Sequence, residues 1–460
     1  MNTNIEDKSL SPAVLSVRSI PKAFLRLATV NILSSLLIPL SSTVSVLFLG
    51  HLHEIHHLEG VALTAALLSS LYEALLFLRA GTTGITAQAS GREDEREMIL
   101  ILARNSLLAL IIGIALTAMQ LPMQETFLAI LEVAPNVSAS VSSCFSAQIW
   151  GAPAILLNFV FFGWLLGIGQ SRLVLLLAFV GTFTNIIMDY FLIVVLDLTS
   201  AGAGISQAAN QYVTLLVGLF LVWRKVRSYN IEIDWKSIFN ASAIRETLFL
   251  NSNIMVARIM SLTTFLFFNY KSSTLGTNIY AENTLLMQVV LIGYACFDGL
   301  GFAVETLSGN FKGAGQKNNL IDLMSFAVKI ALLISLIIAG VCTLFPTWVF
   351  NLFTNHSEIV SGIHLYSPWL VSVLCFGSIE FALGGYYLGL AEGCAIRNSA
   401  FISLFTAFLP IAIWSSYAHS NHALWLAMSA FPAVRAIVFW IIFPKTLDLL
   451  LTEDSDLATN

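Results

Sequence analysis

The sequence predicts an all-α integral membrane protein, with twelve transmembrane helices in two six-helix lobes related by pseudo-twofold symmetry. Three observations lead to this fold class: the composition, the spacing of long apolar runs and a repeated set of motifs. The chain has 460 residues, of which 57% are apolar and 11% charged, and its mean hydropathy is +0.82. Soluble domains carry about 25% charged residues, so this chain has too little polar surface for a soluble fold. The net charge of −5 and the absence of long Lys/Arg runs argue against nucleic acid as a partner.

Apolar stretches of the length that a membrane-spanning helix requires recur along the whole chain. A bilayer core of about 30 Å takes roughly 20 residues of helix at about 1.5 Å per residue. In the first half, these stretches cover residues 27–49, 61–80, 98–119, 141–168, 173–196 and 201–223. In the second half, they cover residues 248–268, 280–307, 321–344, 365–390, 400–417 and 424–443. Two short amphipathic stretches, near Pro122 and Pro346, are expected at equivalent places on the outer face.

Lysine and arginine are distributed unevenly between the connecting segments. If both termini are cytoplasmic, sixteen of the 22 Lys and Arg residues fall in cytoplasmic segments, five inside spans and only Lys271 on the outer side. Cytoplasmic loops of membrane proteins are enriched in these residues. The sequence therefore predicts a cytoplasmic N-terminal segment (1–26), an N-terminal six-helix lobe (27–223), a cytoplasmic linker (224–247), a C-terminal six-helix lobe (248–443) and a cytoplasmic tail (444–460).

Several short motifs recur in the same order in both halves, which indicates a duplication. The pattern at residues 163–167, Gly-Trp-Leu-Leu-Gly, returns at 385–389 as Gly-Tyr-Tyr-Leu-Gly, 222 residues later. Three further matches have offsets between 218 and 225, and they pair residues 89–91 with 307–309, 121–122 with 345–346, and 172 with 397. Six-span repeats of the same orientation imply two lobes related by an axis along the membrane normal, as in transporters.

Certain of these motifs carry a resemblance to a known family. The stretches are residues 81–91 (GTTGITAQASG), 149–153 (IWGAP), 163–172 (GWLLGIGQSR) and 185–189 (NIIMD), then Asp298-Gly299 followed by Glu305, and Arg397-Asn398-Ser399. In this order they resemble the multidrug and toxic compound extrusion (MATE) family, in its DNA-damage-inducible F (DinF-like) branch.

The resemblance implies a secondary active exporter with alternating access, and no enzymatic activity. Such an antiporter moves organic, often cationic or amphipathic, compounds outward while H⁺ or Na⁺ flows inward, and it needs no cofactor besides that ion. The expected partners are small organic substrates and membrane lipids, and the expected form is a monomer in a bacterial inner membrane. The alternative is a flippase of the same superfamily for lipid-linked oligosaccharides or other lipids, which would hold more basic residues in its central cavity.

One position of the first span departs from the family's pattern. The family has a proline, five residues, an aspartate and then a Gly-His pair. Here the frame runs from Pro39 to Gly50-His51, but Ser45 stands at the aspartate position. In the family, that aspartate is central to cation coupling in the N-terminal lobe. The coupling ion therefore stays open between H⁺ and Na⁺.

A group of polar residues is expected in the outer half of the N-terminal lobe. Asp189 lies about 24 Å into the fifth span, and Ser45 lies at a similar depth in the first. Asn185 lies one turn before Asp189 on the same helical face, and Gln207, where the family has threonine, lies near the outer end of the sixth span. We expect these four side chains to form the cation-coupling site. Because Asp189 is its only carboxylate, H⁺ is favoured over Na⁺; the alternative is that Asp189 only joins two helices.

Charged residues within the C-terminal lobe form a second set of candidates. An ionisable group in mid-bilayer costs about 2.5–3.5 kcal/mol, so each is expected to have a partner or a function. Arg258 and Asp298 come at nearly equal depth in neighbouring spans, and we expect them to pair. Glu305 matches a family motif; the alternative is a helix-end residue facing water. Two further pairs, matched by depth as structural bridges, are Glu73 with Arg104 and Glu380 with Lys329.

No metal site and no catalytic group are expected. Residues 53–57, His-Glu-Ile-His-His, match the H-E-x-x-H pattern of zinc proteases. That pattern needs a helix and a third ligand, whereas here it falls in a short loop between two spans. No nucleophile and base are clustered at a membrane face, which argues against a membrane enzyme.

Overall fold

The computed structural model describes residues 19–50, 55–131, 134–231 and 235–458, and these ranges contain helices and turns but no strand. The described chain forms two compact units. Unit 1 holds the residues up to Ile32, the short segment Ala87–Arg92 and everything from Phe249 onward; unit 2 holds Leu33–Thr86 and Glu93–Leu248. Three of the unit boundaries fall within helices, so that each of these helices contributes to both units.

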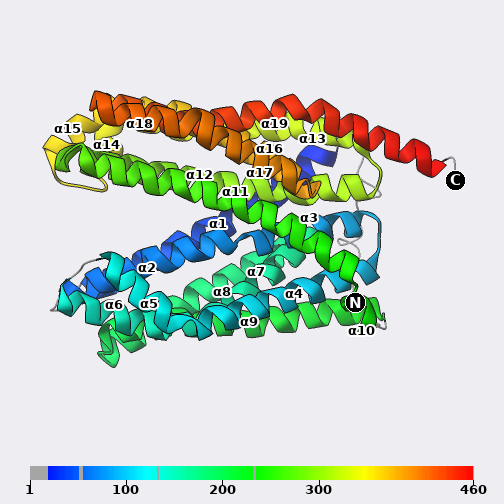
Figure 1. The fold of residues 1–460 in the computed structure, drawn as a ribbon, viewed down its shortest axis with the longest axis horizontal. Helices are drawn as coiled ribbons and strands as arrows, with labels where there is room; N and C mark the ends of the chain where they lie inside the picture. The colour runs from blue at the N-terminus through cyan, green and yellow to red at the C-terminus, as the bar shows by residue number, and fades with distance from the viewer. Residues whose placement is uncertain (1–18, 51–54, 132–133, 232–234, 459–460) are drawn as a thin grey trace. The chain divides into compact units, whose positions relative to one another are not determined.

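The helices of the first half cover the predicted spans (Figure 1), but the second span, 61–80, is divided at Leu76 between two helices. Their bounds are α1 Ile20–Gly50, α2 Ile55–Leu75, α3 Phe77–Gly91, α4 Glu95–Ala118, α5 Gln120–Leu131, α6 Pro135–Gln148, α7 Ala152–Gly167, α8 Ser171–Asp189 and α9 Thr199–Tyr229. A 3₁₀ turn at Ile149–Gly151 joins α6 to α7, and a wider π-helical turn at Tyr190–Val195 continues α8. Helix α5 is the predicted amphipathic segment near Pro122.

The second half repeats this order. Its helices are α10 Trp235–Ile238, α11 Ala241–Thr274, α12 Thr277–Gly313, α13 Lys317–Leu344, α14 Pro346–Phe350, α15 Ser357–Tyr366, α16 Trp369–Gly389, α17 Gly393–Ser403, α18 Leu409–Ala418 and α19 Asn421–Ala458. A π-helical turn at Leu404–Phe408 joins α17 to α18. Several helices run beyond the predicted spans, because polar residues at their ends continue the hydrogen-bonded backbone.

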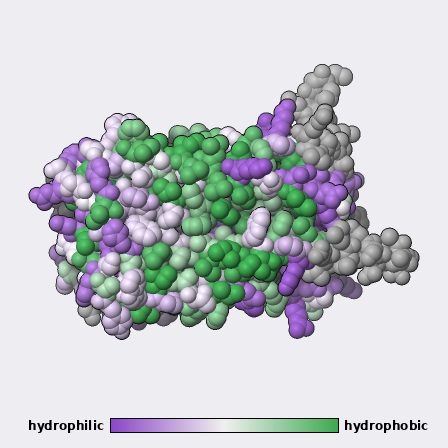
Figure 2. Space-filling view, turned by 90° about the horizontal axis from the view of Figure 1, so that it is seen from above, coloured by the Kyte–Doolittle hydropathy of each residue, from purple (hydrophilic) through white to green (hydrophobic). Residues whose placement is uncertain are grey.

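Eleven helical stretches of the described chain are long and apolar enough to cross a membrane. Helix α11, with 34 residues, has the length for a twelfth span but carries many polar side chains along it. Figure 2 shows apolar side chains over the middle of the visible face, with polar ones gathered toward its two ends. Among the large apolar side chains that stay exposed are Ile111, Ile114, Leu216, Leu333 and Ile337. In a membrane protein such side chains face lipid.

The duplication is visible in how glycines pack within each half. A Cβ at Gly163 would collide with the carbonyl oxygen of Arg79, and a Cβ at Gly385 would collide with that of Gly301. Both members of the contact are shifted by 222 residues. The same shift relates Gly167, packed against Thr83 and Thr86, to Gly389, packed against Glu305 and Ser308. The two halves therefore share helix packing as well as helix order.

A reciprocal contact within unit 1 has the pattern that a twofold axis produces. A Cβ at Gly91 would collide with the carbonyl oxygen of Asn310, and a Cβ at Gly313 would collide with that of Gln88. Residue 88 corresponds to 310, and residue 91 to 313, by the same shift of 222. Reciprocal contacts of this kind are characteristic of twofold symmetry.

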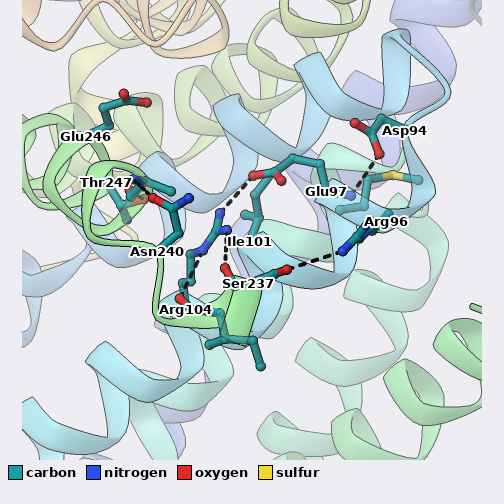
Figure 3. A network of polar contacts seen from close by, with 12 residues as sticks. Asp94, Arg96, Glu97, Ile101, Arg104, Ser237, Asn240, Glu246 and Thr247 are labelled. Atoms are coloured by element: carbon teal, nitrogen blue, oxygen red, sulfur yellow. Dashed lines mark hydrogen bonds and ion pairs between the residues drawn. The ribbon is translucent and has the colours of Figure 1, made fainter. Parts of the chain in front are cut away.

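The segment between the halves is anchored to α4 through the short helix α10 (Figure 3). The Arg104 guanidinium donates to the carbonyl oxygens of Ser237 (2.8 Å) and Ile238 (3.3 Å), at the C-terminal end of α10. It also forms an ion pair of 2.9 Å with Glu97, two turns earlier on its own helix. The predicted pairing of Arg104 with Glu73 is therefore wrong, because the arginine side chain reaches along α4 to the linker.

Candidate functional site

Asp189 ends α8 and is fully buried. The π-helical turn that follows it, where the amide of Leu196 donates to the carbonyl oxygen of Phe191 (2.9 Å), widens the helix directly after the carboxylate. Helix α1 lies beside α8 and is joined to it by Thr182, whose hydroxyl donates to the carbonyl oxygen of Leu37 (3.3 Å). Helical widenings of this kind are frequent at functional sites.

The Asp189 carboxylate lies among uncharged hydrogen-bonding groups from three helices. The hydroxyl of Ser45 on α1 donates to Oδ2 of Asp189 and also lies 3.4 Å from Oδ1 of Asn185. The Asn185 amide donates to Oγ of Ser206 on α9 (3.0 Å), and Gln207 donates to Oδ1 of Asn185 (3.3 Å). Helices α1, α8 and α9 thus meet at one carboxylate.

One oxygen of this carboxylate remains open. Oδ1 of Asp189 is buried and has no hydrogen-bond partner among the described residues. A buried polar atom without a partner is costly, and a carboxylate oxygen in this state is a natural place for a proton or a small cation. Chemically, the site can hold one exchangeable proton, and its other side chains stay neutral.

A hydrophobic cluster covers the next turn of the chain after Asp189. It contains two buried residues with three partly buried ones packed against them: Ile193 and Ala203, with Phe48, Leu58 and Val61. Phe48 also contacts the ring of Tyr190, at 6.2 Å between centroids. Apolar side chains therefore pack around the turn that follows the carboxylate.

The structure brings together all four side chains that the sequence singled out in the N-terminal half: Ser45, Asn185, Asp189 and Gln207. Three are buried and Gln207 is half-buried. Sequence reasoning missed Ser206, which both accepts from the Asn185 amide and donates to its carbonyl oxygen (3.2 Å). Its position next to Gln207 was no signal, because neighbouring residues of a helix point about 100° apart.

In the C-terminal half, the predicted candidates are buried to different degrees. Arg258 on α11 and Asp298 on α12 are both partly buried, and their mutual pairing stays a prediction. Glu305 is fully buried within α12. The alternative that it faces water at a helix end is therefore wrong, because α12 continues to Gly313.

The ion pair that sequence reasoning assigned to Glu380 has a different partner. Oε1 of Glu380 on α16 lies 2.7 Å from the Arg435 guanidinium on α19, whereas Lys329 is exposed on α13. The prediction of a Glu380–Lys329 pair is wrong. The pairing was inferred from depth along the chain alone, and Lys329 lies on an outward face of its helix.

The histidine-rich segment takes part in packing between helices. His53 lies outside the described residues. His57 lies in the first turn of α2, with Nδ1 at 2.8 Å from Oγ of Ser200 and 3.2 Å from Oγ of Ser140. Within the described residues, no group of three or more His, Cys, Asp or Glu side chains is placed to hold a metal ion.

The chain is similar to known proteins over most of its length. The sequence model of the MatE family matches residues 31–191 and 254–417, once in each half. DNA damage-inducible protein F of Escherichia coli (strain K12) is 30% identical over 418 residues, which cover 90% of each chain. The probable multidrug resistance protein NorM of Thermotoga maritima is 22% identical over 86% of each chain.

The fold also matches solved structures. An outward-facing conformation of a multidrug resistance MATE family transporter of the MOP superfamily superposes with a TM-score of 0.85 and 20% identity, over 94% of this chain and 96% of that one. A MOP superfamily transporter from Pyrococcus furiosus matches with the same TM-score, identity and coverage.

Proposed function

Because the chain belongs to the MatE (multidrug and toxic compound extrusion) family of multi-pass membrane transporters, we propose that it is a proton-driven exporter of organic cationic or amphipathic compounds. The names of its relatives support export of small compounds over lipid flipping. We place it in a bacterial inner membrane as a monomer, with both termini and the linker in the cytoplasm.

The observation that carries the choice of ion is the single buried carboxylate at Asp189, with one open oxygen among uncharged neighbours. A proton needs only that oxygen. A sodium ion would need several further oxygen ligands, as hard cations do, and Oδ1 of Asn185 already faces the donors of Ser45 and Gln207. The site is therefore better suited to H⁺ than to Na⁺.

Ser45 provides a way for the bound proton to change the contacts between helices. A serine hydroxyl can donate or accept, whereas an ionised carboxylate only accepts. With Asp189 ionised, Ser45 donates to Oδ2. Once the Asp189 carboxyl group is protonated and turns its O–H toward Ser45, it becomes the donor, and the Ser45 hydrogen turns toward Oδ1 of Asn185. Protonation thus rearranges the hydrogen bonds between α1 and α8, the step we assign to coupling.

Proteoliposomes loaded with ethidium, a planar organic cation, test this proposal. With the outside made acidic and Na⁺ absent, ethidium efflux should accelerate over protein-free liposomes. An inward Na⁺ gradient at equal pH should leave efflux unchanged. Efflux that is accelerated by the Na⁺ gradient alone would overturn the choice of ion. If neither gradient accelerates efflux, coupled export of ethidium is overturned.

A further inference from the structure

Inside the C-terminal half, a carboxylate and two aromatic rings surround the guanidinium of Arg435. The guanidinium forms the 2.7 Å ion pair with Glu380 and donates to Oγ of Ser261 on α11 (3.3 Å). Its central carbon lies 5.8 Å from the ring centroid of Phe431 and 5.6 Å from that of Phe439. Glu380 and Arg435 are only 8% and 9% exposed. A carboxylate with aromatic faces is the environment that proteins use to bind organic cations.

The aromatic rings are held from behind. The Phe439 ring stacks on Tyr387, at 4.8 Å between centroids, and the Tyr387 hydroxyl donates to the carbonyl oxygen of Phe439 (2.7 Å). Phe431 packs in a buried apolar cluster with Phe408 and Ala427. These contacts fix the rings independently of Arg435, so that the environment persists if the arginine side chain moves away.

The fold does not require charges at this place. The shift of 222 residues that relates the two halves places Asn158 where the second half has Glu380. Asn158 donates to the side chain of Gln211 (3.1 Å) and to its carbonyl oxygen (3.0 Å). In the first half, a neutral amide pair therefore joins α7 to α9, the helices that correspond to α16 and α19. A buried ion pair is rarely more stabilising than a neutral replacement, so the charges of the second half are explained better by function.

Arg435 is also not fully bound where it lies. Its Nε is buried and has no hydrogen-bond partner among the described residues. An arginine with an unsatisfied buried N–H loses less on moving away than a fully hydrogen-bonded one, while Glu380 keeps its attraction for a cation.

We propose that Glu380, Phe431 and Phe439 form a binding site for planar organic cations, which Arg435 occupies while no ligand is bound. The arginine guanidinium is planar, delocalised and weakly hydrated, so it has the same chemistry as the ligands we assign to the site. A guanidinium or amidinium compound binds by replacing the Arg435 side chain. The proposal deepens the exporter function above, since it names a substrate class and the residues that bind it.

Methylguanidinium binding to the purified protein in detergent tests the site, read as the shift in thermal unfolding over a concentration series. In Arg435→Ala, the concentration for a half-maximal shift should fall roughly tenfold below that of the unsubstituted protein, because no internal cation competes. Adding Glu380→Gln to that variant should abolish the gain. The matched control, Lys329→Ala, removes an exposed positive charge from α13 and should behave as the unsubstituted protein.

The proposal is overturned if Arg435→Ala binds no more tightly than Lys329→Ala, or if the gain survives Glu380→Gln. If Arg435→Ala does not fold alone, methylguanidinium added during extraction should restore its folded fraction, and failure to do so also overturns the site. Binding needs no ion gradient and should persist in an Asp189→Asn background. Failure of the methylguanidinium test therefore does not contradict proton coupling at Asp189. Failure of proton coupling does not contradict the cation site at Glu380.

Discussion

Ser45 and Asp189 are the two residues from which we infer the coupling ion of the N-terminal half. The Ser45 hydroxyl donates a hydrogen bond to the Asp189 carboxylate. The side chains that surround this carboxylate are uncharged. Depth and the i, i+4 spacing were enough to group Ser45, Asn185 and Asp189 from the sequence. The role of Ser206 was not predictable, because neighbouring residues of a helix point about 100° apart and the sequence does not give the rotation of α9 against α8.

Asn185 is the residue that connects this network. It is 1% exposed, it accepts from Gln207 and donates to Ser206, and its Oδ1 lies 3.4 Å from the Ser45 hydroxyl. Asn185→Ala should lower the free energy of unfolding by about 1–3 kcal/mol, since buried partners lose their hydrogen bonds. The measurement is thermal unfolding in detergent. Asn355→Ala, at an exposed position, should change little, and an equal loss in both variants would contradict the network.

At the scale of helices, the sequence located the spans, but not the side of each helix that faces its neighbours. Glu380 shows the limit. Its predicted partner Lys329 has suitable depth but is exposed, whereas Arg435 on α19 faces α16 and lies 2.7 Å away. Hydrophobic periodicity is weak in helices that are apolar on nearly all sides, so the sequence does not show which side of such a helix faces its neighbours. Depth alone then allows several partners for one charged residue.

Helix packing in the two halves gives a matched pair of substitutions. Gly163→Ala and Gly385→Ala each place a methyl group against a backbone carbonyl of the neighbouring helix. Each should therefore cost about 1–3 kcal/mol. Thermal unfolding in detergent measures both.

A third glycine is the control for this pair. Gly340 lies inside α13, and no atom outside its own helical turn comes within 4 Å of the place where an alanine methyl group would lie. Gly340→Ala should therefore be neutral or stabilising by about 0.5–1 kcal/mol. If Gly163→Ala and Gly385→Ala differ strongly from each other, the packing of the two halves is not equivalent.

At the scale of the whole molecule, composition and the 222-residue repeat were sufficient to predict the helical membrane fold and its duplication. The family match over residues 31–191 and 254–417 agrees with that division. Helix ends were less predictable, because polar residues continue several helices beyond the apolar stretches; α9 reaches Tyr229 and α11 begins at Ala241.

The orientation in the membrane is testable with single cysteines in a background without the five native ones. The distribution of basic residues predicts a cytoplasmic linker, so Lys236→Cys should resist an impermeant maleimide added to intact cells and react after permeabilisation. Ser273→Cys, exposed near the other end of α11, should react in intact cells. Labelling of Lys236→Cys from outside would reverse the topology.

The central claim is that Asp189 couples export to the entry of protons. Proton-driven export by the Asp189→Asn variant tests it most directly. The substitution keeps the shape of the side chain but removes its exchangeable charge, and Asp197→Asn, at an exposed position just after the π-helical turn, is the matched control. In proteoliposomes with an acidic exterior, ethidium efflux should be lost in Asp189→Asn and unchanged in Asp197→Asn. Gradient-free ethidium exchange should continue in both variants. Efflux at the unsubstituted rate in Asp189→Asn would contradict proton coupling at this carboxylate and move coupling to the C-terminal half.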